Sequence, residues 1–350
     1  NLPDVAVVPS EHFNTVLWTG NDTARTISGV GFQPDFTWIR NREIVTNHLL
    51  FDAIRGAKNA LRSDSTNAES TNASDELLTF ASDGFTLGTG EDVNGNAEGI
   101  VAWNWKANGS GSSNTNGSIN STVSANVDAG FSIVSYTGTG ANATVGHGLS
   151  SAPEMVIIKG RDDLNGNGNA GNWTVYHKSI NSPNAEDYFI SLNSTSAAAT
   201  DGSASRWNNT DPTNALISIG TDWEVNNNNA KFIAYCFHSV DGYSKVGSFS
   251  GNSNVDGTFV YCGFKPALII QKGSDHAHGW DIWDNKRDPH NVATKELFAQ
   301  SSQVEYTDAT YTSIDFVSNG FKLRTSNSSE NSGENIFIVF AETPFKYSNA

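Results

Sequence analysis

The chain has 350 residues and a formal net charge of −16, with 37 Asp and Glu against 21 Lys and Arg. This length allows two or three ordinary domains. The acidic balance, without any dense basic run, argues against a nucleic-acid-binding protein. No run of 18 apolar residues occurs, so the sequence predicts no transmembrane helix.

The residue composition favours strands over helices. Asn, Ser, Thr and Gly are abundant and charged residues make up only 17% of the chain. Aromatic and β-branched residues come in short clusters separated by Gly, Asn and Asp, which is typical of strands joined by many turns. The sequence therefore predicts an all-β fold.

The chain opens with an arm-like stretch, residues 1–12, and it begins at Asn1 rather than Met. We therefore expect a processed product or a piece of a longer protein. From Phe13 onward, four phrases follow one another in an order that recurs twice more along the chain. The first phrase reads "FNTVLWTG" from Phe13, "FSIVSYTG" from Phe131 and "YSKVGSFSG" from Tyr243.

The remaining three phrases keep the same order in each copy. The second is a proline followed by a short apolar run that ends in a basic residue, and its prolines are Pro34, Pro153 and Pro266. The third reads "HLLFDAIRG" (48–56), "NWTVYHKSI" (172–180) and "GWDIWDNKR" (279–287). The fourth reads "GIVAWNWKA" (99–107), "KFIAYCFHS" (231–239) and "NIFIVFAET" (335–343).

Four phrases in one order, three times over, predict three tandem β units at residues 13–107, 131–240 and 241–350. Nearly continuous apolar runs such as "MVIIK" and "FIAYCF" indicate strands buried on both faces. We expect β-sandwich or jelly-roll-like units with minor helix. The best helical candidates are residues 52–63 and residues 291–299.

Two further features concern how the units are joined. Residues 108–130 begin with a Gly/Ser/Asn-rich stretch (108–126) that fits either a flexible linker or an edge ribbon. Cys236 and Cys262 are the only cysteines. Each lies within a strand-like run, so two buried thiols are favoured over a disulfide, although the pairing stays open.

The candidate metal site lies in "DDLNGNGNAGNW" (162–173). Asp163, Asn165 and Asn167 match the first half of a calcium loop, but Thr174 stands where the bidentate Glu is required. A polar hairpin tip is the alternative, because Asn-Gly steps favour turns. His276 and His278 have a spacing that could bind a metal, but no third ligand is visible, so an exposed loop is expected. No cofactor other than calcium is expected.

Catalytic signatures such as G-x-S-x-G, H-E-x-x-H and the P-loop are absent from the sequence. We therefore expect a protein that is not an enzyme. Trp207 and Trp223 lie in Asn-rich, loop-like surroundings, and they are the candidate platforms for stacking against a glycan.

The phrases "VVPSEHFNTVLWTGN", "STVSANVDAGFSIVSYTGTG" and "FIAYCFHSVDGYSKVGSFSGN" resemble repeats in virion proteins of marine tailed bacteriophages, including cyanophages. The resemblance implies a structural protein on the virion surface, outside cells, and most readily a tail-fibre or appendage component that helps the particle attach to its host. The alternatives are a capsid-surface decoration protein and a cellular or secreted glycan-binding adhesin.

The same resemblance implies the partners. They are other virion proteins, further copies of this chain in a homo-oligomer (with a trimer favoured), and glycans of the host cell surface. No nucleic acid and no membrane insertion are expected. Repetition presents the same loops several times, so weak contacts can add together through effective concentration.

Overall fold

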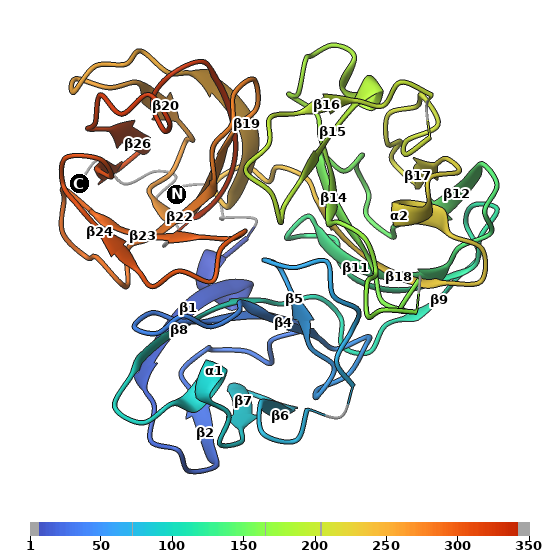
Figure 1. Cartoon of the computed structure of the whole chain (residues 1–350), viewed down its shortest axis with the longest axis horizontal. Helices are drawn as coiled ribbons and strands as arrows, with labels where there is room; N and C mark the ends of the chain where they lie inside the picture. Colours follow the sequence, from blue (N-terminus) through green and yellow to red (C-terminus); the bar gives the residue numbers. More distant parts are fainter. Residues whose placement is uncertain (1–6, 72, 165, 204, 342–350) are drawn as a thin grey trace, which may run out of the picture.

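Antiparallel strands are the main regular structure of the computed structural model, which describes residues 7–71, 73–164, 166–203 and 205–341 (Figure 1). The all-β prediction is therefore confirmed. The strands form three sandwiches, which we call unit 1 (residues 13–107), unit 2 (108–240) and unit 3 (241–341). No helix in the described part of the chain is long and apolar enough to cross a membrane.

Unit 1 packs a larger inner sheet against a smaller outer sheet. The inner sheet has the order β1-β8-β3-β4-β5 and the outer sheet the order β2-β7-β6. The strands are β1 (Phe13–Thr19), β2 (Arg25–Ser28), β3 (Phe36–Asn41), β4 (Leu49–Asp52), β5 (Leu61–Arg62), β6 (Leu77–Ala81), β7 (Gly84–Leu87) and β8 (Gly99–Trp105). The 3-10 turn η1 (Pro9–Glu11) precedes β1, and the short helix α1 (Glu91–Asn94) precedes β8.

Unit 2 repeats this plan with a longer inner sheet. Its order is β16-β15-β14-β13-β18-β11-β10-β9, and the outer sheet is β12-β17. The strands are β9 (Ser112–Asn114), β10 (Ser121–Asn126), β11 (Phe131–Thr137), β12 (Ala143–Gly146), β13 (Met155–Gly160), β14 (Thr174–His177), β15 (Tyr188–Ser191), β16 (Ala199–Thr200), β17 (Leu216–Ile219) and β18 (Lys231–Phe237). It also contains η2 (Ala185–Asp187) and α2 (Trp223–Asn226).

Unit 3 has the inner order β19-β27-β21-β22-β23-β24 and the outer order β20-β26-β25. The strands are β19 (Ser244–Ser250), β20 (Phe259–Tyr261), β21 (Pro266–Gly273), β22 (Trp280–Asp284), β23 (Lys295–Phe298), β24 (Tyr306–Thr307), β25 (Ile314–Val317), β26 (Gly320–Leu323) and β27 (Glu334–Ala341). The five-strand order of unit 1 therefore recurs as β11-β18-β13-β14-β15 and as β19-β27-β21-β22-β23.

The three prolines stand at the same place in this plan. Pro34 and Pro153 lie two residues before β3 and β13, and Pro266 is the first residue of β21. A proline is tolerated at the entry of a strand because its missing N–H is not required there. The strands of the first phrase also end at matching residues: β1 ends at Thr19, β11 at Thr137 and β19 at Ser250.

Both helical candidates from the sequence are wrong. Residues 52–63 form the end of β4, a turn and β5. The Asp52 carboxylate accepts hydrogen bonds from the N–H groups of Ile54 (3.1 Å) and Arg55 (2.8 Å), and Gly56 follows with φ +88°. The Asp52 side chain thus stabilises a turn in a segment whose composition alone favours a helix. Residues 291–299 contain β23, which pairs with β22 and so takes its conformation from the sheet.

The Gly/Ser/Asn-rich stretch forms an edge ribbon rather than a free linker. β9 pairs with β10, and β10 pairs with β11, so both strands extend the inner sheet of unit 2. Asn126 anchors the ribbon to unit 1, because its Nδ2 donates to the backbone oxygen of Lys106 at 3.1 Å.

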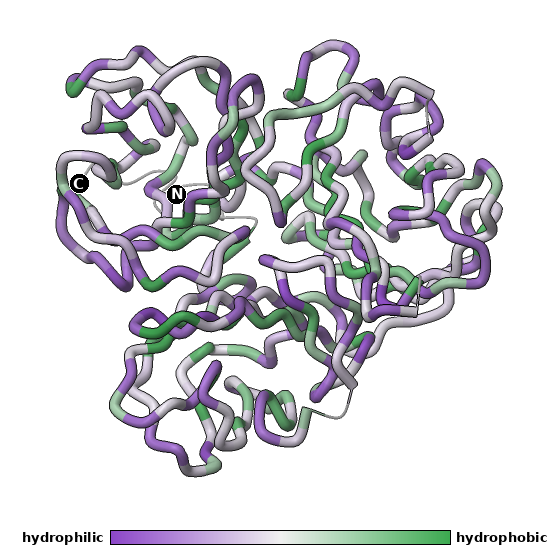
Figure 2. The backbone as a smooth tube through the Cα atoms, in the orientation of Figure 1, coloured by the Kyte–Doolittle hydropathy of each residue, from purple (hydrophilic) through white to green (hydrophobic). Residues whose placement is uncertain are grey.

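The inner sheets of all three units bury their second face in one shared apolar core. Along β8, Val101, Trp103 and Trp105 point into this shared core, whereas Ile100 and Ala102 belong to the core of unit 1 itself. The ring of Phe36 lies 4.4 Å from that of Tyr235 in unit 2. This arrangement explains the continuous apolar runs, since both faces of each central strand are buried. Figures 1 and 2 show the three lobes meeting at hydrophobic strands.

A buried cation ends the second phrase of every unit. In each case the side chain donates to a backbone oxygen of a neighbouring unit: Arg40 to Ser302 (2.8 Å), Lys159 to Thr66 (3.0 Å) and Lys272 to Thr195 (3.4 Å). Burial lowers the pKa of these groups to about 10, 7 and 8 respectively. The repeated basic residue is therefore a structural link between units.

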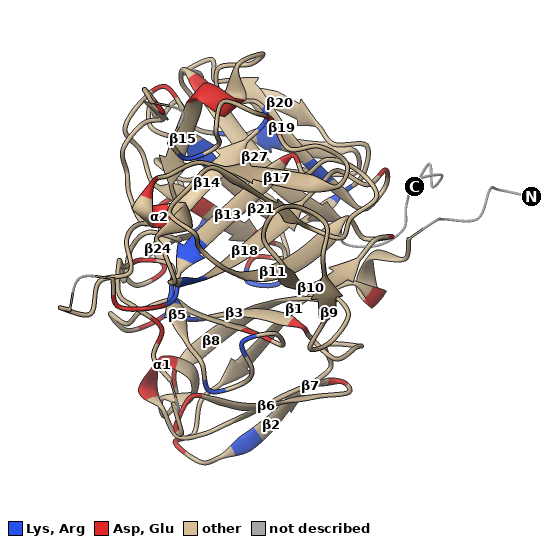
Figure 3. Ribbon diagram, turned by 90° about the vertical axis from the view of Figure 1, so that its right-hand side faces the viewer, with Lys and Arg blue, Asp and Glu red and all other residues tan. Residues whose placement is uncertain are grey.

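The remaining charges and the two thiols complete the description of the fold. Lys and Arg are scattered over the view in Figure 3. Cys236 and Cys262 are buried free thiols, and burial raises the pKa of each to about 12. The favoured prediction of two buried thiols is confirmed.

Candidate functional site at a seam between units

The three seams between units are related by a common backbone hydrogen bond. Glu305 N–H donates to the oxygen of Arg42 at 2.7 Å, and Glu69 N–H donates to that of Arg161 at 2.9 Å. At the third seam, the Ala198 N–H donates to the backbone oxygen of Ser274 at 2.8 Å. These bonds identify which side chains occupy equivalent places at the seams between units 1 and 3, units 1 and 2, and units 2 and 3.

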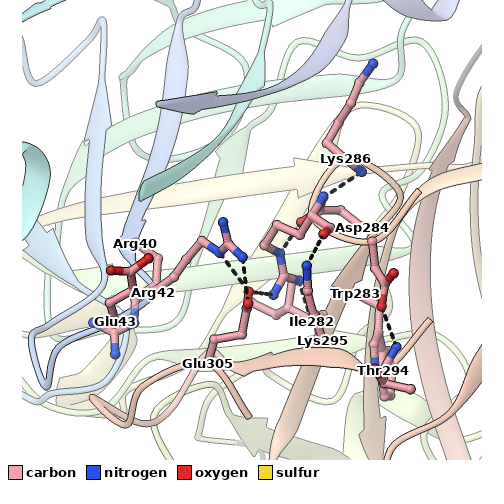
Figure 4. A network of polar contacts seen from close by, with 12 residues as sticks. Arg40, Arg42, Glu43, Ile282, Trp283, Asp284, Lys286, Thr294, Lys295 and Glu305 are labelled. Carbon is pink, nitrogen blue, oxygen red and sulfur yellow. Dashed lines mark hydrogen bonds and ion pairs between the residues drawn. The ribbon is translucent and has the colours of Figure 1, made fainter. Parts of the chain in front are cut away.

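A chain of buried and half-buried charges closes the seam between units 1 and 3 (Figure 4). Glu305 accepts two hydrogen bonds from Arg42, at 2.8 and 2.7 Å, and a third from Arg287 at 2.9 Å. Asp284 then accepts from Nε of Arg287 at 2.5 Å and from the indole N–H of Trp103 at 3.0 Å. Burial alone would lower the pKa of Arg287, but the two carboxylates outweigh it and raise that pKa.

The same chain of charges closes the seam between units 1 and 2. Arg161 binds Glu69 through two hydrogen bonds, at 2.6 and 3.0 Å. Arg55 lies 3.6 Å from Glu69 and donates to Asp52. The hydroxyl of Tyr235 donates to Asp52 at 2.8 Å and so takes the place of Trp103. Two of the three seams are therefore closed by matching networks.

The seam between units 2 and 3 has none of these charged side chains. The five equivalent positions hold His177, Ile180, Ala198, Ser274 and Ile338. Burial lowers the pKa of His177 to about 4, so its ring is neutral at pH 7. Its Nε2 donates to the backbone oxygen of Phe337 at 3.2 Å, because Ile338 offers no polar partner.

A polar hollow of about 420 Å³ lies at this seam. Its walls include three of the replacing residues, Ile180, Ala198 and Ser274. At the sister seams the longer Arg and Glu side chains occupy these places. A second hollow of about 540 Å³ adjoins it and shares Asn181 and Tyr188. Each volume falls within the roughly 300–1,000 Å³ usual for small-molecule sites.

The walls of the seam hollow are rich in hydrogen-bond acceptors. Two carboxylates, Asp275 and Glu334, line it together with serine hydroxyls and the ring of Tyr188, and no Lys, Arg or His is among its lining residues. Burial opposes ionisation of Asp275, but hydrogen bonds from His276 and the N–H of Glu334 outweigh it and lower its pKa. The hollow is therefore negatively charged at neutral pH.

The structure places the two candidate tryptophans differently. Trp207 is only 1% exposed, and its indole N–H donates to the backbone oxygen of Tyr188 at 2.9 Å. It packs in the core of unit 2, so the expectation of an exposed platform is wrong for Trp207. Trp223 is 43% exposed and lies on α2, and it is not among the residues that line the seam hollow.

The calcium loop is not assembled among the described residues. Asp163 Oδ1 accepts from the N–H of Gly166 (2.9 Å) and of Asn167 (3.2 Å), which is the geometry of a polar turn. Asn165 lies outside the described residues. Asp163 also lines a hollow of about 280 Å³, together with two more carboxylates, Glu69 and Asp162, and the cations Arg161 and Lys231.

The histidine pair is likewise held by hydrogen bonds within the fold. His276 contacts Asp275 at 2.7 Å and the oxygen of Ser329 at 2.9 Å, and His278 contacts Asp281 at 2.7 Å. Among the residues that the structure describes, no group of three or more His, Cys, Asp or Glu side chains could hold a metal ion.

Sequence reasoning missed the seam hollow, although a signal was present. The third phrase carries an Arg at the same place in units 1 and 3, Arg55 and Arg287, whereas unit 2 has Ile180 there. Only the structure shows that Ile180 lines the same hollow as Ala198 and Ser274. These two residues stand where the other seams have charged side chains.

The family model of DUF7483, described as a domain of unknown function, matches residues 8–344 and so spans all three units. No curated protein matches the chain.

Proposed function

Because the chain belongs to the DUF7483 family, whose function is unknown, we propose a role from its architecture and its sequence resemblance. The protein is a non-enzymatic structural component exposed on a bacteriophage particle, most readily in a tail fibre or appendage. It contributes to attachment through the seam hollow between units 2 and 3, which contacts the host surface.

The observation that carries this proposal is the loss of the charge network at a single seam. Two seams are closed by Arg-Glu-Arg-Asp chains, while the third exposes acceptors and an aromatic ring in a hollow of about 420 Å³. Recesses of this kind are where small polar groups are recognised. The shared core and the acidic surface support the rest, since a particle surface requires a rigid and soluble body.

Immunogold labelling of purified particles with antibodies against the chain tests the location. We expect gold along tail fibres or appendages. Gold over the capsid would instead favour a capsid-surface decoration protein. Gold on cell envelopes and none on particles would overturn the virion proposal in favour of a cellular adhesin.

Assembly of several chains is part of the same proposal. Phage fibres are commonly trimers, and a homotrimer would place three seam hollows on one fibre, so that weak contacts add together. Light scattering on the purified chain is expected to give the mass of a trimer. A monomeric mass at micromolar concentration would contradict it.

A further inference from the structure

We propose that the seam hollow binds an uncharged pyranose sugar, whose hydroxyls donate to the carboxylates of Asp275 and Glu334. This assignment rests on the attachment role proposed above and names the chemistry of its ligand. It concerns residues different from the two tryptophans that the sequence singled out.

The carboxylates of Asp275 and Glu334 are each held by a hydrogen bond, and each can still accept further hydrogen bonds. Asp275 Oδ1 contacts Nδ1 of His276 at 2.7 Å, and Glu334 Oε1 accepts from the hydroxyl of Ser250 at 2.5 Å. An ionised carboxylate has about four acceptor positions on two oxygens, so each group can take further hydrogen bonds from neighbouring sugar hydroxyls. Both groups lie at the solvent-facing side of the hollow, where their residues are exposed.

The hollow also has apolar and aromatic lining residues. Ile180 is buried and Tyr188 is half-buried, and both line the hollow. A pyranose has hydroxyls at its rim and C–H groups on its faces, so it matches a site that combines carboxylates with an aromatic ring. Asn181, which both adjoining hollows share, adds an amide that can donate as well as accept.

The charge of the hollow excludes anionic sugars. No Lys or Arg lines it, so a sulfate, phosphate or uronate group would face Asp275 and Glu334 without a compensating cation. The hollow at the seam between units 1 and 2 differs, because the cations Arg161 and Lys231 line it beside Glu69, Asp162 and Asp163. The hollow between units 2 and 3 has carboxylates but no Lys or Arg among its lining residues.

The sister seams provide the variant that tests the site. The double substitution Ala198→Glu, Ser274→Arg copies the pair that Glu69 and Arg161 form, and it fills the hollow with side chains that the same backbone accommodates elsewhere. Saturation-transfer difference NMR on the full chain, with methyl glucoside, methyl mannoside and methyl galactoside as probes, measures binding. We expect transfer to at least one glycoside in the wild type and a loss of about tenfold or more in the double variant.

A second variant keeps the test decisive if the double variant does not fold. Ser248→Trp places a large ring at an exposed position of the hollow, and it should also abolish binding. Ser28→Trp, on the exposed side of β2 in unit 1, is the matched control and should leave binding unchanged. Undiminished binding in a folded Ser248→Trp variant would overturn the site.

Anionic probes test the ligand class separately from the attachment role. We expect no saturation transfer to glucuronate or glucose 6-sulfate from the seam hollow. Any transfer to these anions in the wild type should therefore remain in the Ser248→Trp variant. A wild type that binds these anions in the hollow, or that binds none of the three neutral glycosides at millimolar concentration, would overturn the assignment. Gold labelling that is absent from particles would refute the attachment role while leaving the sugar assignment standing.

Discussion

At the scale of single residues, each unit has one asparagine with the same structural role: Asn94, Asn226 and Asn331. Each is fully buried, and its amide bridges two stretches of its own unit. Asn226 donates to the oxygens of Ala141 (2.6 Å) and Gly220 (2.7 Å) and accepts from the N–H of Thr139 at 2.8 Å. Asn94 and Asn331 make the matching contacts in units 1 and 3. These asparagines fasten the turn that follows the first phrase.

Replacing Asn226 with Ala should therefore destabilise the chain. The change removes a buried hydrogen bond to the oxygen of Gly220 and two half-buried ones, to the oxygen of Ala141 and from the N–H of Thr139. An unsatisfied buried group costs about 1–3 kcal/mol, and each of the other two bonds contributes about 0.5–1.5 kcal/mol. We expect a loss of about 3 kcal/mol in the free energy of unfolding, measured by urea denaturation. Asn228→Ala, at an exposed position of the same loop, is the control and should change stability little.

Glu330 gives a pH-dependent test at the same scale. Burial, together with the nearby charge of Asp281, raises its pKa to about 9, above the ordinary value of 4.5. The folded state therefore keeps a proton that the unfolded chain releases, so the contribution of Glu330 to stability is present below pH 4.5 and is lost as pH rises toward 9.

The Glu330→Gln variant removes this titration. Its stability relative to the wild type should rise steadily between pH 5 and pH 9, as measured by urea midpoints at three pH values. A difference that stays constant over this range would show that Glu330 is already ionised in the folded protein.

At the scale of elements, the strand phrases and their order could be predicted because strand chemistry is local. An apolar run preceded by proline predicts a strand wherever it occurs, and β3, β13 and β21 follow that pattern. The helical candidates failed because their outcome depends on contacts outside the segment. Within residues 291–299, β23 forms because β22 offers a pairing edge, which no local pattern reveals.

The candidate site depended even more strongly on distant contacts. Ile180, Ala198 and Ser274 lie far apart along the chain, and each is unremarkable by itself. The prediction that Trp207 is exposed was wrong because it relied on the Asn-rich sequence around this residue. In the structure its indole packs edge-on against Tyr176 in the core of unit 2.

The seam networks yield a paired prediction at this scale. Glu305→Gln removes the negative charge that pairs with Arg42 and with the buried Arg287, and it leaves Asp284 as the carboxylate bound to Arg287; the loss should cost about 3 kcal/mol. Ala198→Gln, at the equivalent place of the open seam, should be nearly neutral because the hollow accommodates it. Thermal unfolding of both variants measures the contrast, and equal losses would contradict the structural role of the network.

At the scale of the whole molecule, the shared core makes the units interdependent. Leu268, Ile270 and Phe340 of unit 3 are buried against the other two units in this core. A sequence repeat indicates three similar units, but it does not reveal that their sheets share a second core, because one unit considered alone shows only which residues are apolar.

The chain should consequently unfold as one body. We expect a single calorimetric transition whose van't Hoff and calorimetric enthalpies agree. Residues 241–341 expressed alone should expose the apolar face of their inner sheet and aggregate. Three separate transitions, or a stable monomeric unit 3, would show that the shared core contributes little.

Fusing three units into one chain has a consequence for how such a protein can diversify. In an assembly of three identical subunits, every substitution at a seam occurs three times, so one that opens the seam removes all three charge networks together. Here each seam is encoded separately. Two have Arg-Glu pairs that hold the body together, while the third has none and can accept new side chains without breaking such a pair. The covalent connection thus allows a substitution at one seam to leave the charge networks of the other two seams intact.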